Sequence, residues 1–118
     1  MYGLPSGTNL DFIKGTSLIQ ACFGPHDLVL NFDEKVSISI SSSVAVGRVG
    51  TSPVRAAKFE AISHDILGLL NRAVQNVTWT QNGTVSLIFE GNELLEIYDD
   101  STNYESYPVR GPMGLIVV

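Results

Sequence analysis

The chain has 118 residues, of which 44% are hydrophobic and 16% are charged, and its net charge is −5. Chains of this length form a single domain with one hydrophobic core, which we expect over residues 1–118. The excess of acid excludes the basic face of a nucleic-acid-binding protein. The lone cysteine cannot form an intramolecular disulfide.

The sequence shows no signal for export or for a membrane. The N-terminus lacks the basic start and apolar run of a signal peptide. No apolar stretch approaches the roughly 20 residues that a membrane-spanning helix needs. We therefore expect a cytoplasmic protein without a membrane partner.

The first half of the chain is predicted to form an antiparallel meander. Residues 16–23 have the composition of a strand, and residues 24–27 (Gly-Pro-His-Asp) are typical of a turn. Apolar and polar residues then alternate over residues 28–32 and again over residues 36–41. This period of two indicates strands with one buried face.

The joint between the two halves is predicted to contain a loop and one helix. Residues 46–51 are rich in glycine, and Ser52-Pro53 is typical of a helix start. Apolar residues then recur at helical spacing, at Phe59, Ile62, Ile66, Leu69 and Leu70. We expect a helix within residues 53–71. An alternative makes residues 55–61 extended and starts a short helix at Ser63.

The second half carries the clearest fold signal. Three alternating runs lie within residues 74–97, separated by Asn82-Gly83 and Gly91-Asn92, two pairs that favour the positive φ angles of tight hairpin turns. They predict a second three-stranded meander. The tail ends in an apolar run, residues 115–118, which we interpret as a last strand.

The two predicted meanders match each other position by position. One constant offset in residue number relates Leu28, Leu30, Phe32, Ile38 and Ile40, in that order, to Val85, Leu87, Phe89, Leu95 and Ile97. For the strand before these residues, the offset is one residue smaller. It relates Leu18, Ala21 and Phe23, in that order, to Val74, Val77 and Trp79. The pattern favours an internal duplication over a chance likeness of two meanders. We expect an α+β fold in which two pseudo-duplicated meanders form a sandwich-like core, with one helix packed on it.

The sequence offers little support for catalysis. Glycine-rich stretches near Gly47 and Gly111 lack the spacing of a nucleotide-binding loop. No serine or cysteine motif accompanies His26 or His64. The carboxylates of Asp99, Asp100 and Glu105 suit calcium or magnesium but lack the spacing of a calcium loop. We expect no enzyme activity, no cofactor and no metal.

Residues 98–107 (YDDSTNYESY) combine tyrosines with carboxylates, a mixture typical of protein interfaces. There is no lysine or arginine between Arg72 and Arg110, so an acidic field would attract a basic partner. The predicted partner-binding residues are Asp99, Asp100, Tyr104 and Glu105. The alternative is a solvated acidic face whose tyrosines cover the end of the core.

The second half resembles a family of small, uncharacterised bacterial domains. The resemblance covers about half of the chain and lies in residues 67–70, 74, 77, 85–89, 95–97, 104–107 (Tyr-Glu-Ser-Tyr) and 116–118. It implies a β-rich fold and no particular activity. By analogy, small acidic domains of this kind resemble immunity proteins, which neutralise toxins.

These features predict a non-enzymatic module that binds a protein partner with a basic surface. The alternative is a small-molecule-binding domain with a pocket between the meanders or between subunits. A homodimer is also predicted, since residues 36–41 carry uncharged serines and no lysine that would discourage pairing of strand edges.

Overall fold

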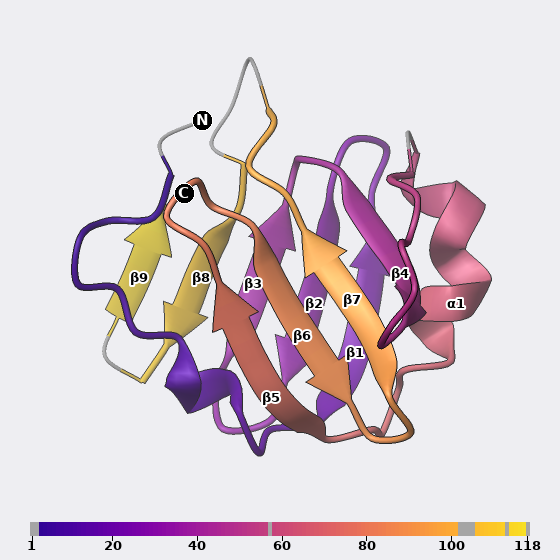
Figure 1. Cartoon of the computed structure of the whole chain (residues 1–118), viewed down its shortest axis with the longest axis horizontal. Coiled ribbons are helices and arrows are strands. Elements are labelled where there is room, and N and C mark those ends of the chain that lie inside the picture. The colour runs from indigo at the N-terminus through magenta and orange to yellow at the C-terminus, as the bar shows by residue number, and fades with distance from the viewer. Residues whose placement is uncertain (1–2, 57, 102–105, 113, 118) are drawn as a thin grey trace.

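The computed structural model describes residues 3–56, 58–101, 106–112 and 114–117 (Figure 1). Two antiparallel sheets lie face to face. The first has the order β1-β2-β3-β8-β9 and the second the order β4-β7-β6-β5. The strands are β1 (Leu18–Phe23), β2 (Leu28–Phe32), β3 (Ser37–Ile40), β4 (Val44–Arg48), β5 (Val74–Trp79), β6 (Val85–Phe89), β7 (Glu93–Ile97), β8 (Pro108–Gly111) and β9 (Gly114–Val117).

Three short helical elements accompany the sheets: η1 (Asp11–Ile13), η2 (Phe59–Ile62) and α1 (Ser63–Leu67). The helix α1 lies beside β4, and η1 lies beside β5 at the other side of the sandwich (Figure 1). The fold is therefore β-rich and of the α+β class, as predicted. None of the described helices has the length and hydrophobicity that a membrane crossing requires.

Each sheet contains one meander and added strands from the other half of the chain: β8 and β9 in the first sheet and β4 in the second. The strand β4 follows β3 in sequence but pairs with β7, whereas β8 follows β7 but pairs with β3. The prediction of three-stranded meanders is therefore incomplete. The prediction of a loop over residues 46–51 is wrong for its first residues, since β4 extends to Arg48. A run as short as Val44-Ala45-Val46 shows its strand character only once a partner strand is known.

The registers of the two meanders correspond. Leu18 pairs with Phe32 as Val74 pairs with Phe89, and both strand pairs shift register directly after this point. Leu28 pairs with Ile40 and Val85 with Ile97. Every one of these correspondences follows the offsets predicted from the sequence, so Phe32 and Phe89 occupy equivalent places.

The two halves meet at an antiparallel bridge between Ser17 and Ala73, which are themselves equivalent positions. The Leu18 amide donates to the Arg72 carbonyl at 3.2 Å, and the Val74 amide donates to the Thr16 carbonyl at 2.8 Å. One carboxylate caps each side of the bridge. Asp33 accepts from the Ser17 amide at 2.9 Å, and Glu90 accepts from the Ala73 amide at 2.6 Å. A local two-fold axis therefore relates the halves.

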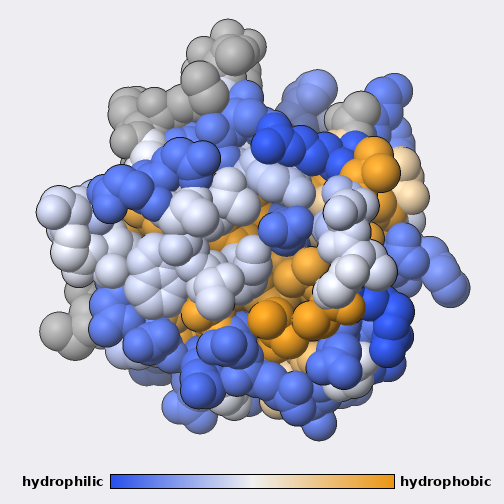
Figure 2. Space-filling view, in the orientation of Figure 1, coloured by the Kyte–Doolittle hydropathy of each residue, from blue (hydrophilic) through white to orange (hydrophobic). Residues whose placement is uncertain are grey.

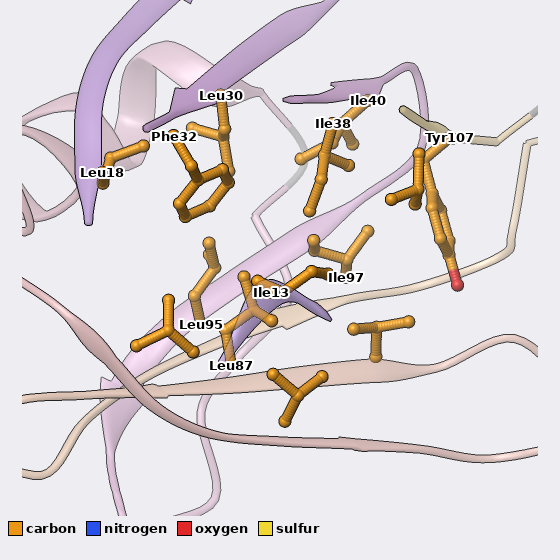
Figure 3. Close-up of a cluster of buried hydrophobic side chains, with 14 of the residues drawn as sticks. Ile13, Leu18, Leu30, Phe32, Ile38, Ile40, Leu87, Leu95, Ile97 and Tyr107 are labelled. Carbon is orange, nitrogen blue, oxygen red and sulfur yellow. The ribbon is translucent and has the colours of Figure 1, made fainter. Parts of the chain in front are cut away.

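The core fills the space between the sheets. Leu30, Phe32, Ile38 and Ile40 of the first sheet face Leu87, Leu95 and Ile97 of the second (Figure 3). Of the ten residues that the sequence places in the core, eight are buried, whereas Phe59 and Trp79 are half-buried at its margin. Those ten are Leu30, Phe32, Ile38, Ile40, Phe59, Ile66, Trp79, Leu87, Phe89 and Ile97.

The outer face of the second sheet is largely hydrophilic, with an apolar patch over β6 and β7 (Figure 2). Ile88 and Leu94 point away from the core on this face, pair directly across the two strands and are half-buried.

The predicted helix is shorter than its apolar period suggests. A start at Pro53 is wrong, because the Ala56 amide donates to the Val44 carbonyl at 2.8 Å and keeps this segment extended along β4. The chain then turns through η2, and the α-helix proper begins at Ser63. The alternative therefore agrees with the structure in its short helix from Ser63, but residues 59–61, which it makes extended, belong to the 3₁₀ helix η2.

The strand chosen for self-association is not a sheet edge. β3 lies between β2 and β8, so its backbone groups are paired on both sides. The predicted homodimer therefore cannot form by pairing of residues 36–41. The edge strands of the described sheets are β1, β9, β4 and β5.

Truncation of the phenylalanine in either half should destabilise the whole protein. Phe32→Ala and Phe89→Ala should each lower the free energy of unfolding by about 3–5 kcal/mol, as expected for a buried aromatic ring. Urea unfolding followed by circular dichroism measures the change. Ser39→Ala, on the outer face of β3, should change it by less than about 0.5 kcal/mol. A loss below about 1 kcal/mol for Phe89→Ala would contradict the described core.

Candidate functional site

A groove of about 1150 Å³ opens at the end of β1 that lies away from the Ser17–Ala73 bridge, and residues from both halves of the chain line it. Its walls are the β1–β2 turn (residues 23–26) and the connector that leads into α1 (Ala56, residues 58–60 and Ser63). Residues 41–43, between β3 and β4, also line it. Asp100 and Ser101 add a contribution from the second half. The groove is open to solvent.

Three consecutive serines connect β3 to β4 along the groove. The Ser41 amide donates to the Ser106 carbonyl at 2.8 Å, and both the amide and the hydroxyl of Ser43 donate to the Asp100 carboxylate. Ser42 differs from its neighbours. Its residue is only 8% exposed, and its hydroxyl has no hydrogen-bond partner in the described part of the chain. A buried hydroxyl without a partner is costly, which makes Ser42 the unusual feature of this site.

Asp100, from the second half of the chain, forms hydrogen bonds and an ion pair with residues of the first half at the groove. Partial burial acts to raise the pKa of its carboxyl group, but the hydrogen bonds from Ser43 and the charge of Arg55 outweigh burial and hold the pKa below its ordinary value. The Arg55 guanidinium lies 3.1 Å from the carboxylate and stacks on the Tyr98 ring, with 3.8 Å from Cζ to the ring centroid. Asp100 is therefore ionised and already paired at neutral pH.

Asp99, the residue before Asp100, forms hydrogen bonds outside the groove. Its carboxylate accepts from the Gly3 amide at 2.6 Å and from the Ser106 hydroxyl. The buried Tyr107 hydroxyl donates to the Gly83 carbonyl, and burial, followed by the nearby Asp99 charge, raises the pKa of this phenol well above its ordinary value. Asp99 and Tyr107 therefore secure the N-terminal segment and the β5–β6 turn.

The structure places only part of the predicted partner-binding set. Asp100 lines the groove, Asp99 contacts Gly3 and Ser106, and Tyr104 and Glu105 lie outside the described residues. Folding also brings cations to the acidic stretch from the first half: Arg55 pairs with Asp100, and Arg48 pairs with Glu93 at 2.8 Å. The acidic field predicted from residue order is therefore weaker than expected.

Sequence reasoning missed the contribution of the first half to this site. The only local signal for it is the run Ser41-Ser42-Ser43 after a strand. The groove offers serine hydroxyls, the Lys58 ammonium and the Asp100 carboxylate as hydrogen-bonding groups, between the Phe23 and Phe59 rings. Among the described residues, no group of three or more His, Cys, Asp or Glu side chains could hold a metal ion. This chemistry suits recognition of a polar backbone or ligand.

Comparison with known proteins gives the chain a family. The model of the family of unknown function DUF6188 matches residues 10–118. The chain belongs to this family. The match extends well beyond the second half, to which the sequence resemblance was limited, and in this DUF6188 protein it includes both meanders and the groove. No curated protein and no solved structure shows significant similarity to the chain. Since the function of DUF6188 is unknown, membership assigns no activity or partner.

Asp100 should make this DUF6188 protein sensitive to acid. A carboxyl group whose pKa is lowered in the folded state adds stability above its unfolded pKa of about 4, and this stability is lost as the pH falls through the folded pKa. Asp100→Asn should remove that part of the pH dependence between pH 6 and pH 2. Urea unfolding at several pH values measures it, with Asp11→Asn as a control at an exposed carboxyl group. Equal slopes for wild type and Asp100→Asn would contradict the described pairing.

Proposed function

We propose that the chain is a non-enzymatic module that binds a protein partner at the groove, which Asp100 and Ser101 line, and through the acidic segment of residues 98–107. The observation that carries the proposal is the groove itself, which is open, lined by hydroxyls and charged groups from both halves, and bordered by Asp100. An open groove favours a macromolecular partner, because small-molecule sites are usually enclosed; here hydroxyls and charged groups share the lining with the Phe23 and Phe59 rings.

The partner-binding set in this proposal remains Asp99, Asp100, Tyr104 and Glu105. Asp99 and Asp100 accept internal hydrogen bonds, so they would shape the binding surface and contribute charge beyond Arg55. A basic partner fits the net charge of −5. If the partner is a toxic protein whose working surface becomes covered, binding would neutralise it in the manner of an immunity protein.

A small molecule between the two meanders is the second candidate. The position of the groove favours it, since residues 41–43 from the first half and Asp100 and Ser101 from the second converge there. Such a ligand would need several hydrogen-bonding groups to match the serines and charges of the lining.

Site-specific cross-linking separates the two candidates. A photo-reactive amino acid placed at Ser41 in the groove should cross-link to one protein when expressed in the source cells. The same amino acid at Thr78, exposed on β5, is the control. Mass spectrometry then identifies the partner. Absence of any protein adduct at position 41 would reject the protein-binding module and favour the small molecule.

Charge should act on the association rate of the identified partner. Glu105→Gln should slow association and reduce its dependence on salt, because ionic screening acts on long-range attraction. Tyr104→Ala should instead speed dissociation, since a buried ring prolongs the life of the complex. Surface plasmon resonance at several salt concentrations measures both rates. Glu34→Gln, in the turn at the opposite end of β2, removes the same charge as a control. Equal association rates for wild type, Glu105→Gln and Glu34→Gln at low salt would show that the acidic segment is only a solvated face.

Self-association, if it accompanies this function, would use another edge than the one predicted. Ile19 is exposed on β1, an edge strand without charged residues. We propose this edge for the homodimer, because uncharged edges pair readily. Light scattering at tens of micromolar should give the mass of a dimer, and Ile19→Lys should return the mass to that of a monomer.

A further inference from the structure

The local two-fold axis gives the groove a counterpart in the second half. At the turns, the Gly24 amide donates to the Asp27 carbonyl as the Thr80 amide donates to the Thr84 carbonyl. After the third strands, the Ser41 amide donates to Ser106 as the Tyr98 amide donates to Ser43. The backbone around residues 23–25 and at Ser41 is therefore repeated around residues 79–81 and at Tyr98, whereas the acceptors Ser43 and Ser106 are not related by the constant offset.

The counterpart of the groove is filled by the chain itself. Residues 3–5, here called the strap, cross the β5–β6 turn. The Leu4 amide donates to the Gln81 carbonyl at 3.2 Å, and the Gln81 side chain donates back to the Leu4 carbonyl at 3.3 Å. The Gly3 amide donates to Asp99 at 2.6 Å, and Leu4 is 5% exposed. The second half therefore holds a short peptide segment that begins at a glycine with a φ of 66° and carries an aliphatic side chain.

The groove in the first half lacks a strap. The offset that relates Leu18 to Val74 also relates Leu10 to Ile66, both fully buried, and it places Phe59 and Glu60 where the strap has Gly3 and Leu4. These two residues belong to η2 and line the groove instead of crossing the β1–β2 turn. The Pro25 carbonyl, equivalent to that of Gln81, accepts no hydrogen bond from the described residues.

Ser42 stands at the position equivalent to Asp99. In the second half this position accepts the amide of the strap, whereas in the first half the Ser42 hydroxyl is buried and unpartnered among the described residues. Both acceptors that bind the strap thus have counterparts in the groove, and neither counterpart is used by the part of the chain that the structure describes. An incoming backbone with two suitably spaced N–H groups would satisfy them.

We propose that the groove binds a short peptide segment of the partner protein in the way that the second half binds its own strap. The Ser42 hydroxyl, which is buried in the structure, rotates toward the segment and accepts one amide, and the next amide donates to the Pro25 carbonyl. The aliphatic side chain of the second residue covers the Phe23 ring, which is exposed on the groove wall. This mode deepens the proposed function and rests on it, since it specifies how a protein partner is recognised.

A peptide with the sequence of the strap is the appropriate probe. The peptide, Tyr-Gly-Leu-Pro-Ser-Gly (residues 2–7), is blocked at both ends and titrated into the ¹⁵N-labelled full chain. Saturable shifts are expected for the amides of Gly24, His26 and residues 41–43. The matched control peptide carries Leu4→Asp and should bind at least tenfold more weakly. Shifts confined to Gln81 and Gly83 would show displacement of the strap and would contradict the proposal.

Ser42→Ala tests the assigned hydrogen bond. The variant should weaken binding of the peptide about fivefold, the effect of one lost hydrogen bond, and should leave the melting temperature unchanged or raised because no internal bond is lost. Ser39→Ala, on the outer face of β3 and outside the groove lining, is the control and should bind as the wild type does. Unchanged affinity for Ser42→Ala would overturn the assignment.

Different results would overturn the strap-like binding mode and the protein-binding function. Absence of saturable shifts in the groove at millimolar peptide overturns the strap-like mode, even when cross-linking at position 41 shows a protein partner. Absence of any protein adduct at position 41 overturns the protein-binding function itself.

Discussion

The structure depends on the exchange of strands between its two halves. β4 leaves the first meander to pair with β7, and β8 leaves the second to pair with β3, so neither sheet is complete without the other half. A meander of three strands would expose one apolar face, whereas the exchanged strands widen both sheets and hold them face to face. The bridge between Ser17 and Ala73 joins the two halves at the local two-fold axis.

The groove and its counterpart in the second half occupy equivalent positions, but only the counterpart is filled by a segment of the chain. One receives Gly3 and Leu4, which bind to Asp99 and to the β5–β6 turn. The other remains a groove, with Ser42 at the position of Asp99 and η2 in place of the strap.

Much of the fold was predictable from alternation of apolar and polar residues. The meanders, their turns and the constant offsets between them follow from side chains that repeat every second position, as at Leu28 and Leu30. The exchanged strands were not predictable, because β4 contains Gly47 and β8 begins at Pro108, and their partners are remote in sequence. The helix start at Pro53 failed for a similar reason: a tertiary hydrogen bond from Ala56 to Val44 overrides the local signal.

The candidate site was predictable only in part. The composition of residues 98–107 predicted Asp99 and Asp100 as site residues. The order of charges along the chain did not predict that Arg55 stacks on Tyr98 and pairs with Asp100. The groove joins segments from both halves of the chain, from the turn at residues 23–26 to Asp100, and no sequence pattern marks such a junction. The equivalence of Ser42 and Asp99 follows from the predicted offset. That this position can accept a backbone amide is known only from the hydrogen bond between Gly3 and Asp99 in the structure.

Strand exchange implies that the two sheets unfold together, and two single probes test this directly. Trp79, the only tryptophan, reports on the second sheet by its fluorescence, and a fluorophore on Cys22, the only cysteine and an exposed one, reports on the first. Denaturant titration followed at both positions should give coincident transitions with the same midpoint and slope, as expected for one cooperative unit. Two separate transitions would show that each half is stable alone and would contradict the interdependence of the two sheets.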